Sequence, residues 1–185
     1  MKEINFYKIE SDFYYPIGEF ISKNIIVAKE MAYTLRKIYK KDDIINFWCR
    51  GSSGAMIASL VARYFPKCCI CHVKKEGENS HAEFITYKSD GYNVIIDDFI
   101  LSGDTINEIY KHLSNSTNST EVDCIAVTRS IIMNKLKIFP KNLICYGIIH
   151  QGNYLSKNDL LNEFDIKLKY HAPINLSKNI HRDTI

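Results

Sequence analysis

The sequence predicts an α/β fold with a mostly parallel, twisted sheet flanked by helices and a small hood from one or both terminal segments. Predicted strands and helices alternate, and the strands are nearly continuous apolar runs, typical of strands buried on both faces of a parallel sheet. The 185 residues and the apolar fraction of 46% suit one domain with a substantial core. We expect a single domain at 1–185, divided into a hood and helix region at 1–40, a core at 44–149 and an extension at 150–185.

The individual elements are read from apolar periodicity and from the residues that interrupt it. Residues 1–17 are rich in aromatic side chains and irregular in pattern, whereas residues 21–39 carry Ile25, Ala28, Ala32 and Leu35 on one helical face. The elements predicted next are a strand at 44–49, a turn at 50–54, a helix at 55–65, a strand at 67–73, a polar loop at 74–83, a hairpin arm at 84–88, a strand at 94–99 followed by a helix, and strands at 122–128 and 143–149. Beyond residue 150 the chain is polar, apart from a short apolar patch at 160–164.

Residues 94–105, Val-Ile-Ile-Asp-Asp-Phe-Ile-Leu-Ser-Gly-Asp-Thr, form the most informative segment. An apolar strand ends at two adjacent acids, Asp97 and Asp98, and a short turn then leads into a helical pattern. Carboxylates at a strand end favour hydroxyls or a metal ion, whereas the amides at the start of a helix favour an anion. A sugar phosphate satisfies both demands. The alternative is an ordinary strand, turn and helix in which both acids are solvated.

This segment resembles the binding motif for phosphoribosyl pyrophosphate (PRPP) in the type I phosphoribosyltransferases, which are Rossmann-like α/β proteins. The resemblance implies that Asp97 and Asp98 hold the ribose hydroxyls, directly or through water on Mg²⁺, so that these two acids are both catalytic and metal-binding residues. It also implies that the 5′-phosphate is bound by the turn residues Ser102, Gly103, Asp104 and Thr105. Asp104 departs from the motif, because an acid is acceptable beside a phosphate only if its side chain points away.

Residues 50–54, Arg-Gly-Ser-Ser-Gly, are a second candidate site. Glycine allows close approach of backbone amides to an anion, and an arginine adds a fixed charge with forked donors. In the resembled family the corresponding loop binds pyrophosphate, which implies that role for Arg50, Gly51, Ser52 and Ser53. The Arg-Gly pair is similar to adenine-type members. Taken alone, the segment would be a plain tight turn.

Residues 74–83, Lys-Lys-Glu-Gly-Glu-Asn-Ser-His-Ala-Glu, are a third candidate. They partly resemble the catalytic loop of orotate phosphoribosyltransferases, although Ala82 replaces a glycine and Asn79 stands near an expected lysine. The resemblance implies that Lys74, Lys75 and His81 close over the leaving pyrophosphate and exclude water. The alternative is a solvated hairpin tip.

The acceptor base is the least readable feature. Arg129 follows the strand at 122–128, where orotate-type members use an Asp-Arg pair to bind the base, but here the pair is Thr128-Arg129. Arg129 is therefore either a base-binding residue or a surface charge. The aromatic N-terminus, including Tyr14 and Tyr15, is either a hood that stacks on the base or a satellite of the core.

One feature of the predicted sheet brings the candidate segments together. The Arg50 loop, the Asp97–Thr105 segment and the Arg129 turn each follow a strand directly. Ligands bind beyond the carboxyl ends of strands in parallel sheets, so we expect all three segments at one edge.

The resemblance implies an enzyme, a glycosyltransferase of the phosphoribosyltransferase class in nucleotide salvage or biosynthesis. It would use Mg²⁺-bound PRPP and a purine or pyrimidine base to form a nucleoside 5′-monophosphate and pyrophosphate, and it would be a homodimer. The alternative is a non-enzymatic regulator of the same fold that binds PRPP or a nucleotide.

Composition sets the expected partners and location. A net charge of +3, from 24 basic and 21 acidic residues, is too slight to indicate nucleic-acid binding. The N-terminus lacks a signal-peptide pattern, and no window is long enough to span a membrane, so a cytoplasmic protein is expected. The six cysteines lack zinc-ligand spacing and are read as reduced, buried side chains.

Overall fold

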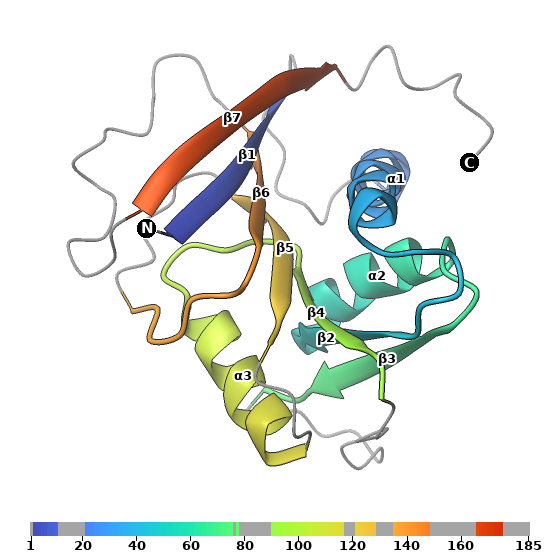
Figure 1. Ribbon diagram of the computed structural model, residues 1–185, viewed down its shortest axis with the longest axis vertical. Coiled ribbons are helices and arrows are strands. Elements are labelled where there is room, and N and C mark those ends of the chain that lie inside the picture. Colours follow the sequence, from blue (N-terminus) through green and yellow to red (C-terminus); the bar gives the residue numbers. More distant parts are fainter. Residues whose placement is uncertain are drawn as a thin grey trace.

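The computed structural model describes residues 2–10, 21–75, 77, 90–116, 121–128, 135–148 and 166–175. The strands are β1 (Lys2–Glu10), β2 (Ile45–Arg50), β3 (Cys68–Val73), β4 (Tyr92–Asp97), β5 (Asp123–Thr128), β6 (Leu143–Ile148) and β7 (Ile166–Asn175), and the helices are α1 (Ile21–Ile38), α2 (Gly51–Ala62) and α3 (Asp104–Ser116). The strands form one seven-stranded sheet in the order β3-β2-β4-β5-β6-β1-β7 (Figure 1). Every pairing is parallel, which confirms the predicted fold class.

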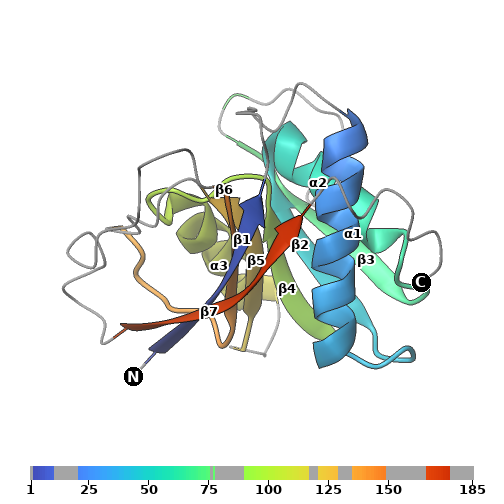
Figure 2. The same ribbon diagram turned by 90° about the horizontal axis from the view of Figure 1, so that it is seen from above.

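Helices cover both faces of the sheet, with α1 and α2 on one side and α3 on the other (Figure 2). Alternate residues of a strand point to opposite faces, so strands such as β2 and β4 supply both cores. On the α1 and α2 side, Met31 and Ile57 pack with strand residues such as Phe47. On the α3 side, Ile106 packs with strand residues such as Ile95. Among the described helices, none is long and apolar enough to cross a membrane.

The side of the sheet on which successive strands are added changes at β2, so that β3 and β4 lie on opposite sides of it. The chain passes from β2 through α2 to β3 on one side, and then crosses to β4 on the other side of β2 before continuing outward to β5 and β6. In an open parallel sheet such a reversal leaves a crevice beyond the carboxyl ends of the two central strands, because the following loops diverge. The segments that follow β2 and β4 therefore flank the expected ligand crevice.

The expected turn at 50–54 is wrong, because α2 begins at Gly51 rather than at residue 55. Arg50 is still extended, with φ −132° and ψ 134°, and Gly51 follows with φ +69°. A glycine can take this left-handed conformation without steric strain, so one residue turns the strand directly into the helix. The helix also ends earlier than predicted, at Ala62.

The expected irregularity of residues 1–17 is also wrong over residues 2–10, because they form β1 between β6 and β7. Its side chains Ile4 and Phe6 are buried on the α3 side, and Ile9 is buried on the opposite side. The expected polar extension beyond residue 150 likewise contains a strand, β7. The exposed positions of β7 include Lys167, Lys169 and Tyr170, which disguise it in the sequence. The hairpin arm at 84–88 and the hood residues Tyr14 and Tyr15 lie outside the described residues.

Candidate active site

The two strongest sequence motifs meet at the carboxyl ends of β2 and β4. Asp97 is the last residue of β4, and the first turn of α2 lies directly against it. A Cβ atom added to Gly54 would lie 3.7 Å from Asp97 Oδ1. The structure therefore brings the Arg50–Gly54 segment and the paired acids together at one edge of the sheet, as the order of the strands predicts.

Asp97 is a buried carboxyl group at the carboxyl end of β4. Its side chain is 4% exposed, and its Oδ2 atom makes no hydrogen bond with any described residue. Burial raises the pKa of Asp97 well above its ordinary value, and the neighbouring charge of Asp98 raises it further. The backbone amides of Phe99 and Asp98 oppose this rise by hydrogen bonding to the carboxylate. A buried polar atom without a partner indicates a place for a ligand.

The donor set around Asp97 and Asp98 fits magnesium better than a cation that needs a protein cage. Within the described part of the chain, no group of three or more His, Cys, Asp or Glu side chains is placed to hold a metal ion. Mg²⁺ is commonly held through one or two carboxylates, with water and substrate phosphates completing its octahedron. Asp97 Oδ2 and the half-buried Asp98 could serve as those carboxylates, directly or through water.

The Ser102–Thr105 segment ends the loop after β4 and includes the first two residues of α3, where the geometry suits an anion. Gly103 has φ +93°, and α3 begins at the next residue. The first intrahelical bond runs from the Asn107 amide to the Gly103 carbonyl at 3.1 Å, so the preceding amides of the helix lack intrahelical partners. These amides and the helix dipole favour an anion at this end of α3.

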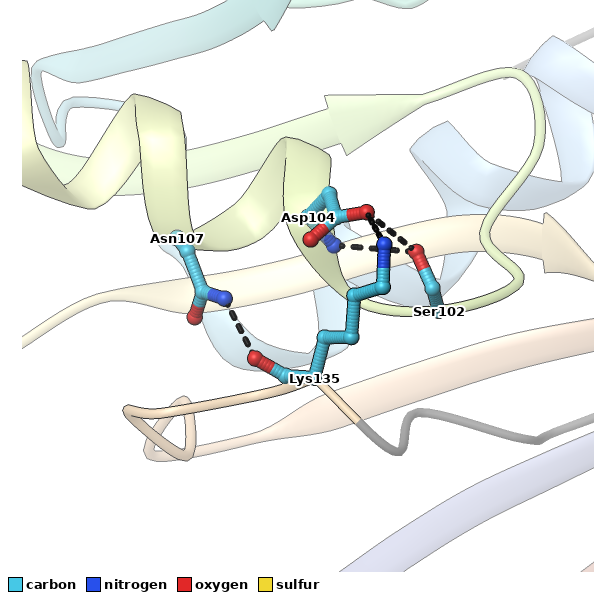
Figure 3. Close-up of polar contacts among 4 residues, drawn as sticks. All are labelled: Ser102, Asp104, Asn107 and Lys135. Carbon is cyan, nitrogen blue, oxygen red and sulfur yellow. Dashed lines mark hydrogen bonds and ion pairs between the residues drawn. The ribbon is translucent and has the colours of Figure 1, made fainter.

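Asp104 lies in this turn, and its side chain is engaged with the protein rather than free (Figure 3). Its Oδ2 accepts a hydrogen bond from Ser102 Oγ at 2.9 Å and forms an ion pair with Lys135 Nζ at 2.9 Å. These two hydrogen bonds hold the pKa of Asp104 below its ordinary value. The carboxylate therefore stays ionised beside the predicted phosphate position.

The backbone around Lys135 is attached to the same turn. The Lys135 amide donates to the Ser102 carbonyl at 3.0 Å, and Asn107 Nδ2 donates to the Lys135 carbonyl at 2.6 Å. The Lys137 amide returns a bond to Asn107 Oδ1 at 2.8 Å. Sequence analysis missed Lys135 and Asn107, because their importance comes from a contact between distant segments and no motif signals it.

The end of β5 fixes the loop between the acids and the turn. The Ile100 amide donates to the Val127 carbonyl at 2.8 Å, and Thr128 Oγ1 donates to the Ile100 carbonyl at 2.8 Å. Both bonds hold the 98–101 loop against the neighbouring strand. Thr128 thus has a positioning role, whereas the next residue, Arg129, lies outside the described residues.

The basic side chain of Lys75 lies beside the start of α2. β3 pairs with β2 in register, with Arg50 opposite Val73, so that Lys74 and Lys75 follow at the edge of the crevice. A Cβ atom added to Gly51 would lie 2.6 Å from Lys75 Cε and 2.9 Å from its Nζ, so the ammonium group lies directly over this glycine. Arg50 Nε is buried without a hydrogen-bond partner in the described structure. His81 lies outside the described residues.

Comparison with solved structures identifies the fold. The chain is similar to a hypoxanthine-guanine-xanthine phosphoribosyltransferase, with 12% identity, a TM-score of 0.51 and coverage of 68% of this chain and 74% of that one. It is similar to a purine phosphoribosyltransferase from Pyrococcus horikoshii Ot3, with 12% identity, a TM-score of 0.50 and coverage of 84% and 97%. A hypoxanthine-guanine phosphoribosyltransferase from Bacillus anthracis gives 12% identity, a TM-score of 0.51 and coverage of 71% and 81%.

No family model matches the sequence, and none of the curated proteins matches it. The shared feature is therefore the three-dimensional arrangement rather than sequence similarity over the whole chain. The fold is that of the type I phosphoribosyltransferases, as the resemblance of residues 94–105 predicted.

Proposed function

We propose that the protein is a phosphoribosyltransferase that joins a purine base to the ribose 5-phosphate of Mg²⁺-bound PRPP and releases pyrophosphate. The observation that carries the proposal is the buried, unpartnered Oδ2 of Asp97 beside an anion-binding turn at the switch point of the sheet. The three structural neighbours are purine phosphoribosyltransferases, which favours a purine over a pyrimidine as acceptor.

Each part of PRPP has a complementary segment in the crevice. The 5′-phosphate would bind the amides and hydroxyls of Ser102–Thr105 at the start of α3. The ribose hydroxyls would face Asp97 and Asp98, and the pyrophosphate would face Arg50–Ser53 with Lys74 and Lys75. Asp97 and Asp98 would hold Mg²⁺, which would supply positive charge to offset the negative charge of the pyrophosphate.

The reaction would proceed by displacement at the anomeric carbon. A nitrogen of the base forms a bond to C1′, the bond between C1′ and the pyrophosphate oxygen breaks, and the bonding electrons leave with pyrophosphate. The nitrogen then loses its proton, when it carries one, to solvent or to the leaving group. The chain contributes mainly by positioning and by charge, because Arg50 and Lys75 offset the negative charge that develops on pyrophosphate.

Several finer predictions belong to the same proposal. His81 would join Lys74 and Lys75 over pyrophosphate, and Arg129 would contact the base; Arg129 directly follows β5 in the sequence, and His81 lies in the segment that connects β3 to β4. We also propose a homodimer in the cytoplasm, as the resemblance implies.

The test is pyrophosphate release from PRPP and Mg²⁺ with a panel of hypoxanthine, guanine, xanthine, adenine, orotate and uracil. We expect turnover with at least one 6-oxopurine, and at least tenfold lower turnover in Asp98→Asn and in Thr105→Ala at unchanged melting temperature. Asp42→Asn, in an exposed ion pair with Lys67, is the control and should retain full turnover.

Two results would contradict this proposal. Wild-type turnover in both variants would refute the site. Tight Mg²⁺-dependent binding of PRPP without turnover on any base would indicate the regulatory protein of the same fold.

A further inference from the structure

Lys135 forms an ion pair with Asp104 of the Ser102–Thr105 segment, which we name the phosphate turn, although the two residues are far apart in the sequence. Its Nζ lies 2.9 Å from Asp104 Oδ2. The side chains of this pair are 61% and 51% exposed, so the ammonium group is accessible to a ligand. Exposed ion pairs contribute little to folding stability, so stability alone does not account for this contact.

The phosphate turn has an electrostatic problem that Lys135 solves. A bound phosphomonoester dianion would lie at the start of α3, next to the ionised carboxylate of Asp104. Like charges at a few ångströms repel, and this repulsion would offset the attraction of the helix amides. The attraction of a neighbouring ammonium group for the dianion offsets this repulsion, so the amides can act unopposed.

The backbone of Lys135 is placed for this role before any ligand binds. Three hydrogen bonds connect residues 135–137 to Ser102 and Asn107, with lengths between 2.6 and 3.0 Å. Leu136 also packs against Gly103, because a Cβ atom at Gly103 would lie 3.0 Å from Leu136 Cβ. Little conformational freedom would be lost on binding, which favours affinity.

An independent observation indicates that a ligand enters the same crevice. Asp97 Oδ2 is buried and has no hydrogen-bond partner among the described residues, at the end of the strand that leads into the phosphate turn. The carboxylate of Asp97 and the turn are separated by only the 98–101 loop, which β5 holds in place.

We infer that Lys135 is a phosphate-binding and specificity-determining residue, which neutralises Asp104 and turns the Ser102–Thr105 segment into a site for a phosphomonoester dianion. The inference rests on the proposed function for the location of the phosphate. On binding, Ser102 Oγ exchanges its bond to Asp104 for one to the phosphate, while Asp104 keeps the bond to Lys135. Ribose, which lacks the phosphate, would then bind this site only weakly.

The test is calorimetry with ribose 5-phosphate and with ribose, for the full chain. We expect Lys135→Met to weaken binding of ribose 5-phosphate at least tenfold and to leave the already weak binding of ribose unchanged. Asp104→Asn should bind at least as tightly as the wild type, and the double variant Asp104→Asn with Lys135→Met should recover to within about threefold of it. Lys141→Met, which breaks the exposed pair with Glu121 at 2.7 Å, is the matched control.

Each outcome decides between the two proposals. Binding by Lys135→Met within twofold of the wild type, or no recovery in the double variant, would overturn the role of Lys135. Failure of the wild type to bind ribose 5-phosphate would overturn it as well. Loss of binding in Lys135→Met together with no turnover on any base would support Lys135 and refute only the proposed transferase activity.

Discussion

Asp97 is held where its charged form is costly in the ligand-free protein. The carboxyl group is buried at the end of β4, next to Asp98, and both factors raise its pKa. Binding of Mg²⁺ or a ribose hydroxyl would offset the cost of this buried charge, because the unpartnered Oδ2 of Asp97 would gain a ligand. Such a penalty in the free protein is the expected signature of a binding residue.

We expect Asp97→Asn to stabilise the ligand-free protein at neutral pH. The raised pKa of Asp97 means that the folded state binds the proton more tightly than the unfolded state does. The stabilisation of the folded state by the protonated carboxyl group is therefore complete below the unfolded pKa of about 4, and it is lost as the pH rises through the folded pKa. Asparagine does not ionise, so the gain over the wild type should grow with pH and reach roughly 1 kcal/mol. Thermal denaturation between pH 4 and pH 8 in chelator measures it.

The control for this variant is Asp42→Asn, because Asp42 is 87% exposed at its side chain. It should change the melting temperature little across the same range. A gain in Asp97→Asn that is largest at pH 4 would contradict the assignment of the cost to the charged form.

At the scale of elements, the two segments predicted to bind anions are built the same way. β2 and β4 end at the same edge of the sheet, and a glycine with positive φ lies at the start of each following helix, Gly51 for α2 and Gly103 for α3. In this conformation the chain turns from the strand or loop into the helix at a single residue, and other L-amino acids adopt it only at a cost. The two segments differ in their covering group, since Lys75 lies over Gly51 whereas Leu136 packs on Gly103.

We expect Gly103→Ala to lower the free energy of unfolding by roughly 2 kcal/mol or more. Part of the loss comes from φ +93°, and the rest from a Cβ atom 3.2 Å from the Leu136 backbone nitrogen and Cα, which must move. Gly77→Ala is a matched control, because Gly77 has φ +84° but nothing within 4 Å of its added Cβ. Chemical denaturation of both variants separates the two contributions, and equal losses would refute the packing role of Leu136.

At the scale of the whole molecule, the sheet is wider than its central βαβ units require. β1 lies between β6 and β7 and joins the two ends of the chain. On one face an aromatic stack crosses these strands. The ring centroid of Tyr7 lies 5.2 Å from that of Tyr146 and 4.3 Å from that of His171. Asn5 Oδ1 lies 2.9 Å from His171 Nε2 and links β1 to β7 again. The N-terminal strand is therefore part of the main core.

We expect Ile4→Ala to destabilise the protein by about 2–4 kcal/mol, because it leaves a cavity between packed strands. Ile4 is 0% exposed and pairs with Leu143 of β6 and Leu168 of β7. Lys167→Ala, at an exposed position of β7, is the control and should cost less than about 0.5 kcal/mol. Equilibrium denaturation measures both, and a loss below 1 kcal/mol for Ile4→Ala would show that β1 is peripheral.

Local patterns in the sequence predict the central strands, most of the length of the helices between them, and the edge of the sheet where Asp97 and Ser102–Thr105 lie. These features come from local apolar runs, and the position of a loop after a parallel strand follows from topology. Neither β1 nor β7 was predicted, and the exposed Lys and Tyr side chains of β7 disguise that strand in the sequence. The start of α2 was predicted too late, because Gly51 alone turns β2 into the helix.

The burial of Asp97 and the ion pair of Asp104 depend on the tertiary structure. The burial of Asp97 and the rise of its pKa depend on the packing of α2, whose Gly54 lies against it. The pairing of Asp104 with Lys135 joins segments that are 31 residues apart, and no local pattern specifies it. Charge compensation at a distance is a property of the folded chain, because it depends on which segments the sheet brings side by side.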